Sequence, residues 1–111
     1  MRVSRITTVV VLLLAVVALT TGAEAQQCPK GKLRLYTSWP MQGAMIPEGT
    51  GMKNGVDLAV SEVGGTVAGY CLEVVNLDDA SPQTGKWDGA VEAENANKAV
   101  ADPQAIVYIG T

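Results

Sequence analysis

Three runs of strand-like residues alternate with two segments of helical periodicity, and this alternation restricts the fold more than any other feature of the chain. A β-α-β-α-β order predicts parallel strands joined by right-handed crossovers, and therefore an α/β fold with a parallel sheet. The strands are predicted at 32–37, 71–77 and 105–109, and the helices at 52–63 and 86–101. The last strand, AIVYI, is continuously apolar, which predicts burial on both faces.

Each predicted helix carries one stripe of apolar or small residues that we expect to face the sheet. The first stripe consists of Met52, Val56, Ala59, Val60 and Val63, and the second of Ala93, Ala96, Ala99 and Val100. Gly64 and Gly65 end the first helix, because glycine readily adopts the left-handed conformation found at helix C-termini. Residues 41–51 are rich in glycine and proline, so we predict a long irregular loop there, a type of segment that often carries function.

The amino-terminal residues have the three parts of an export signal. Arg2 and Arg5 supply positive charge, residues 9–19 are apolar, and Ala23 and Ala25 are the small residues that a signal peptidase reads. Export predicts a periplasmic or extracellular location.

We therefore predict a signal peptide at 1–25 and a single domain at 26–111. An uncleaved anchor is the alternative, although the apolar run is shorter than the roughly 20 residues that span a bilayer. A membrane-associated form of the exported chain stays open.

The chain contains two cysteines, and export would carry both into an oxidising compartment. Cys28 lies just ahead of the first predicted strand and Cys71 opens the second, so both sulfurs start from the same edge of a parallel sheet. We predict a Cys28–Cys71 disulfide. Two free buried thiols are the alternative.

Composition argues against several classes of function. The formal net charge is −3, and this argues against a nucleic-acid partner, which would require a basic surface. The sequence has no histidine, the commonest general base and metal ligand. Asp78 and Asp79 are compatible with acid–base chemistry or magnesium binding, but we favour a structural role at the end of a strand. We predict no catalytic residue, no metal and no cofactor.

Ligands of open parallel sheets bind beyond the carboxyl ends of the strands, where the loop after residue 37 begins. Trp39 could stack on a ligand there, or pack beneath the loop. Met41 belongs to a group of methionines whose adaptable side chains could shape a pocket. Glu48 could recognise a cation or a hydroxyl group, or lie in solvent near the amino end of a helix.

Several segments together carry a family resemblance that composition does not show. They are LRLYTSWP with the PMQG turn, GMKNGVDLAVSEVGG, LEVVNLDDASP, and AENANKAVADP running into AIVYIG. This ordered set, which covers residues 32–110, resembles the amino-terminal part of the type I periplasmic-binding proteins, specifically the branched-chain amino-acid binding proteins of ABC transporters.

The resemblance implies a two-lobed protein that closes over a small ligand, of which this chain supplies an incomplete first lobe. Together with the position of the loop after the first strand, it predicts ligand contacts at Trp39, Met41, Gln42, Glu48 and Thr111. Glu48 matches the position of an aromatic wall residue in relatives that bind amino acids, and this departure puts an aliphatic ligand preference in question. Most of the groups that hold the ligand's carboxylate and ammonium would follow the third strand, beyond the last residue printed.

The implied function is therefore solute binding for an ABC importer, with an amino acid or similar small polar ligand, a membrane permease as partner, and no enzymatic activity. A ligand-sensing ectodomain of a receptor with the same fold is one alternative. A secreted α/β hydrolase is another, and it would need a nucleophile elbow and a histidine that this sequence lacks.

Overall fold

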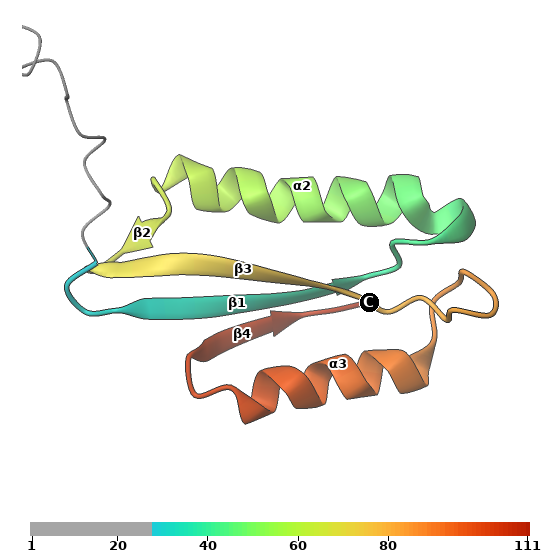
Figure 1. Cartoon of the computed structure of the whole chain (residues 1–111). Helices are drawn as coiled ribbons and strands as arrows, with labels where there is room; N and C mark the ends of the chain where they lie inside the picture. The colour runs from blue at the N-terminus through green and yellow to red at the C-terminus, as the bar shows by residue number, and fades with distance from the viewer. Residues whose placement is uncertain (1–27) are drawn as a thin grey trace, which may run out of the picture.

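The computed structural model describes residues 28–111, so the predicted signal peptide at 1–25 lies outside the described residues. Residues 28–111 form four strands, two α-helices and one short 3-10 helix (Figure 1). In chain order these are β1 (Lys32–Trp39), η2 (Gly43–Met45), α2 (Ile46–Glu62), β2 (Thr66–Val67), β3 (Tyr70–Asp78), α3 (Gly89–Ala101) and β4 (Ala105–Ile109).

The strands form one sheet in the order β2-β3-β1-β4. β1 lies in the middle and pairs in parallel with both β3 and β4, whereas β2 pairs antiparallel with β3. α2 and α3 cover opposite faces of this sheet (Figure 1). The α/β class and the parallel arrangement of the three long strands are confirmed, and the short β2 makes the sheet mixed.

β2 could not be predicted from the sequence, because a strand of two residues is too short to show any periodicity. The predicted end of the preceding helix is confirmed: Gly64 and Gly65 both have positive φ. The turn that they form directs the chain back along the edge of β3, where Thr66 lies opposite Cys71.

The prediction of an irregular loop at 41–51 is wrong for most of its length, because α2 already begins at Ile46. Pro47 lies in the first turn of α2, where its missing N–H costs nothing. Gly49 is buried, and a Cβ there would lie 2.3 Å from the carbonyl oxygen of Pro40. Glycine is therefore present because the helix begins in direct contact with the chain that leaves β1.

α3 begins at Gly89, later than the predicted residue 86, because Asp88 caps its amino end. The Asp88 carboxylate accepts hydrogen bonds from the backbone nitrogens of Ala90, at 2.8 Å, and Val91, at 3.3 Å.

The predicted buried stripe of α3 is also only partly correct. Ala99 is buried, but Ala93 is exposed and Val100 is 87% exposed. The second buried residue of the helix is Asn95, which makes hydrogen bonds to the sheet. Polar contacts, rather than a run of small side chains, set the rotation of α3.

β4 is an edge strand within the part of the chain that the structure describes, so the prediction of burial on both faces is wrong. Ile106, Val107 and Ile109 are all exposed. The reason is that β4 pairs only with β1 among residues 28–111, and its outer edge has no neighbouring strand there.

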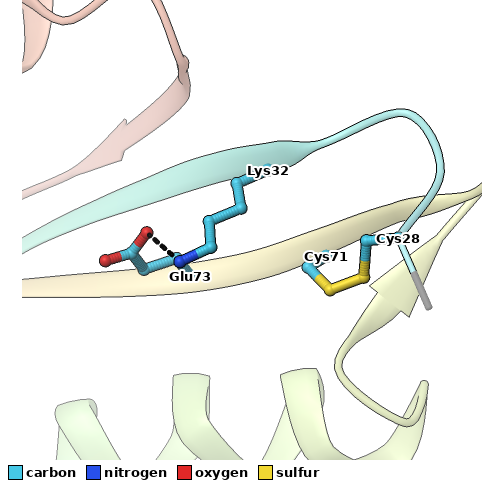
Figure 2. Close-up of a disulfide and its surroundings, with 4 residues drawn as sticks. All are labelled: Cys28, Lys32, Cys71 and Glu73. Atoms are coloured by element: carbon cyan, nitrogen blue, oxygen red, sulfur yellow. Dashed lines mark ion pairs between the residues drawn. A yellow bond between two sulfur atoms is a disulfide. The ribbon is translucent and has the colours of Figure 1, made fainter. Parts of the chain in front are cut away.

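The predicted Cys28–Cys71 disulfide is confirmed, with a Cα–Cα distance of 5.3 Å (Figure 2). It joins the chain just before β1 to the start of β3, beside the ion pair of Lys32 and Glu73 at 3.8 Å. Such a bond is compatible with an extracytoplasmic location. Within residues 28–111, no helix is long and apolar enough to cross a membrane.

A polar network around Asp102 also joins β1 to the end of α3. Asp102, which follows α3, accepts hydrogen bonds from the Arg34 guanidinium at 2.9 Å and from the Tyr36 hydroxyl at 2.8 Å. A backbone hydrogen bond from Gln104 and these two side chains hold the pKa of Asp102 below its usual value. The network fixes the carboxyl end of α3 against β1.

The most buried residues lie at the carboxyl half of β1 and just beyond β3. They include Thr37, Ser38, Trp39, Pro40, Asp79 and Ala80, and Asn95 and Ala99 of α3 are also buried. Several of these side chains are polar, and buried polar groups need specific partners. The core of this domain therefore adjoins the edge of the sheet where its functional site is expected.

Candidate functional site

The carboxyl ends of β1, β3 and β4 meet at one edge of the sheet (Figure 1). The strand order reverses between β1 and β4: the chain leaves β1 for α2 on one face and reaches β4 from α3 on the other. Ligands of open α/β sheets bind in the crevice that such a reversal opens. We call this region the switch-point edge, and it comprises residues 40–45, 79–88 and 110–111.

Asp78, the last residue of β3, organises the loop that follows β1. Its carboxylate accepts hydrogen bonds from the Met41 backbone nitrogen at 2.9 Å, the Gln42 side-chain amide at 2.6 Å and the Ala80 backbone nitrogen at 2.9 Å. Burial alone would raise the pKa of Asp78, but these three hydrogen bonds outweigh it and hold the pKa below 3.8. Asp78 is therefore an anionic anchor for two neighbouring loops.

The same two loops also touch backbone to backbone. A Cβ added at Gly43 would lie 2.8 Å from the carbonyl oxygen of Gly85. No side chain fits between the two residues, so the loop after β1 and the loop after β3 are fixed relative to each other.

Asn95 connects α3 to this arrangement. It is 2% exposed, and its amide donates hydrogen bonds to the Ser38 hydroxyl at 3.0 Å and to the Asp78 carbonyl oxygen at 2.8 Å. This role could not be predicted from the sequence, because α3 contains both Asn95 and Asn97 and only the structure shows that Asn95 is the buried one. Asn95 therefore links α3 to the carboxyl ends of β1 and β3.

Thr111 and Trp87 form the part of the edge next to β4. The Thr111 hydroxyl donates to Asp79 at 2.8 Å, and the Trp87 indole nitrogen donates to the Thr111 carbonyl oxygen at 3.0 Å. Trp87 is 50% exposed, so one part of its ring is held in place while another faces solvent. An exposed, fixed aromatic ring can stack on a ligand, although Trp87 is not among the ligand contacts predicted from the sequence.

The structure brings three of the five predicted ligand contacts to the switch-point edge: Met41, Gln42 and Thr111. Glu48 is exposed in the first turn of α2 instead of lying in a loop. Trp39 is buried between α2 and the sheet.

Trp39 lines an apolar cavity of about 490 Å³ that opens between α2 and the sheet. The sheet contributes Leu35, Leu72 and Ile109 to this cavity, and the predicted apolar stripe of α2 supplies most of the rest, which confirms that the stripe faces the sheet. No charged side chain lines the cavity, so it offers no group that would orient a polar solute.

The anchoring role of Asp78 leads to a prediction. Asp78→Asn is expected to lower the free energy of unfolding by about 1 kcal/mol at neutral pH, because a neutral amide accepts hydrogen bonds less strongly than a carboxylate. The lowered pKa means that this contribution is present above pH 3.8 and is lost as the pH falls through the folded-state pKa.

Urea denaturation of both proteins across acidic pH measures this effect. The stability difference should shrink as Asp78 becomes protonated, and a difference that stays constant would contradict its anchoring role. Asp57→Asn is the matched control, because Asp57 is a partly exposed surface residue paired with Lys53 on α2.

Comparisons of this chain with protein-family models, curated proteins and solved structures found no match. The fold and the geometry of the switch-point edge are therefore the basis for a functional proposal.

Proposed function

We propose that this chain is the amino-terminal part of an extracytoplasmic solute-binding protein of the type I periplasmic-binding class. Its ligand is an amino acid or a similar small polar solute, which it delivers to an ABC importer in the membrane. The parallel arrangement of β1, β3 and β4, with helices on both faces, supports this proposal. The disulfide is compatible with the extracytoplasmic location that the function requires.

One observation carries the proposal: Met41 and Gln42 follow β1, Thr111 follows β4, and these are the two strands that flank the reversal of strand order. Residues that are distant in sequence thus meet where ligands of open α/β sheets bind. The Gln42 amide and the Thr111 hydroxyl keep hydrogen-bonding capacity for a small polar molecule beside their bonds to Asp78 and Asp79. The exposed ring of Trp87 offers a stacking surface next to them.

The amino end of α2 adds a feature that favours a carboxylate. No side chain caps this end, which lies at the same edge of the sheet (Figure 1). The dipole of a helix attracts a negative group at its amino end. A free amino acid has such a group, and its carboxylate would be favoured there in competition with the carboxylate of Glu48, which lies in the same turn.

The proposed mechanism involves no bond making or breaking. The solute settles on the switch-point edge, a second lobe closes over it by a hinge motion, and the closed form docks to the permease. The hydrogen bonds of Asp78 and Asn95 would keep the residues that the first lobe contributes to the site in one conformation. Less conformational entropy would then be lost when the solute binds.

A thermal-shift measurement on the complete product of the reading frame tests the proposal. One member of a panel of amino acids and related polar solutes is expected to raise the melting temperature, because it binds the native state. At a concentration of 100 times Kd, the native state gains about 2.7 kcal/mol.

Gln42→Ala is expected to reduce this ligand-dependent shift, because Gln42 lies at the proposed site. Gln104→Ala is the matched control, since Gln104 is exposed at the opposite edge of the sheet, just before β4. If no solute of the panel shifts the melting temperature, or if both variants reduce the shift equally, the proposed function is wrong.

A further inference from the structure

Two carboxyl groups near the end of β4 each have one buried oxygen without a hydrogen-bond donor. Asp79 is fully buried, and its Oδ1 has no partner, although its Oδ2 accepts from Thr111. Glu92, in the first turn of α3, has a buried Oε2 that also lacks a partner. An unsatisfied buried carboxylate oxygen is costly, so this arrangement requires an explanation.

The two side chains meet each other: the Asp79 and Glu92 carboxyl groups are within hydrogen-bonding reach. No basic side chain compensates for them, since the ion pairs among residues 28–111 involve neither group. Two carboxylates in contact inside a protein cannot both be ionised at low cost. A single proton between them would give each carboxyl group the partner that it lacks.

We propose that Asp79 and Glu92 share one proton, and that the resulting hydrogen bond holds the end of β4 against the amino end of α3. Glu92 lies directly against the strand end, because a Cβ added at Gly110 would lie 1.9 Å from its Oε1. The Tyr108 hydroxyl donates to the Glu92 backbone oxygen at 3.4 Å, and Thr111 donates to Asp79. The carboxyl pair and the strand end thus form one connected unit.

The groups around the pair come from every element packed against it. Ser38 of β1 and Tyr108 of β4 contribute hydroxyl groups, and Thr111 contributes another. Asp78 of β3 adds further negative charge rather than compensating for it. The surroundings therefore favour the protonated form of the pair.

The sign of the pH dependence follows from this environment. Burial, together with the nearby charges of Glu92 and Asp78, raises the pKa of Asp79 above 3.8, against the opposing hydrogen bond from Thr111. The shared proton therefore stabilises the fold fully at low pH, and this contribution is lost as the pH rises through the raised pKa. We therefore expect the contact between the end of β4 and α3 to weaken as the pH rises, whatever solute the protein binds.

The test is a titration of the full chain by NMR of its side-chain carboxyl carbons. The pKa of Asp79 is expected to lie above 3.8, so its carboxyl carbon should titrate above that pH. Glu92→Gln supplies a permanent amide donor to Asp79, so it should abolish the shared step and raise the melting temperature at neutral pH by about 4 °C or more.

Glu94→Gln is the matched control, because Glu94 is an exposed residue of the same helix paired with Lys98. It should keep the pH profile of the unmodified chain. Titration of Asp79 at its ordinary value, or an unchanged pH profile in Glu92→Gln, would overturn the proposal. The titration of the unmodified chain tests the proposal even if the variant does not fold. Because this titration involves no solute, its outcome is independent of the proposed function.

Discussion

Replacing Cys28 and Cys71 together with alanine is expected to lower the free energy of unfolding by about 4 kcal/mol. The bond joins residues 43 positions apart, and a cross-link that closes a loop of this length restricts the unfolded chain strongly. Small domains have a total stability of only about 5–15 kcal/mol. We therefore expect the variant to be barely folded at physiological temperature.

Urea denaturation of the full chain measures this loss, and reduction of the unmodified protein with a thiol should reproduce it. Lys32→Gln is the local control, because it removes the exposed ion pair beside the disulfide and leaves the cross-link intact (Figure 2). Exposed pairs of this kind contribute about 0–1 kcal/mol. An unchanged urea midpoint in the double variant would show that the bond does not stabilise the fold.

Two glycines of α2 are expected to respond to the same substitution with opposite signs. Gly49→Ala should destabilise the protein by about 1–3 kcal/mol, because the new Cβ would lie 2.3 Å from the Pro40 carbonyl oxygen and 3.0 Å from the Met41 sulfur. A backbone carbonyl cannot rotate away as a side chain does. The helix must therefore move away from the end of β1.

Gly51→Ala is the matched substitution in the same helix, and no atom lies within 4 Å of its new Cβ. Alanine has the higher helix propensity, so this variant should gain about 0.5–1 kcal/mol. Thermal denaturation of the two variants beside the unmodified chain checks both signs. Equal effects would show that the contact between α2 and Pro40 does not limit the position of the helix.

Much of the fold could be predicted from short-range patterns. The strand at 105–109 and the end of the first helix at Gly64 and Gly65 follow from residues that are close together in sequence. The parallel order follows from the alternation of strands and helices, and the disulfide from two cysteines placed before neighbouring parallel strands. All of these features depend on local chemistry or on connectivity.

The start of α2 could not be predicted in this way. Gly43, Pro47, Gly49 and Gly51 suggest a loop when their propensities are added together. In the structure, Pro47 occupies the one part of a helix that tolerates it, and Gly49 allows the close approach to Pro40. Packing against the end of β1 outweighs a propensity that is unfavourable by itself.

The sequence by itself determined the α/β class, the parallel direction of the long strands and the Cys28–Cys71 pairing, because periodicity and cysteine position are properties of the linear chain. Only the tertiary structure decided which polar groups meet. Asp78 anchors Met41 from 37 positions away, and Asn95 reaches Ser38 across 57 positions. Such contacts depend on how the helices rotate over the sheet, and that rotation is set by the hydrogen bonds of buried polar groups rather than by local patterns.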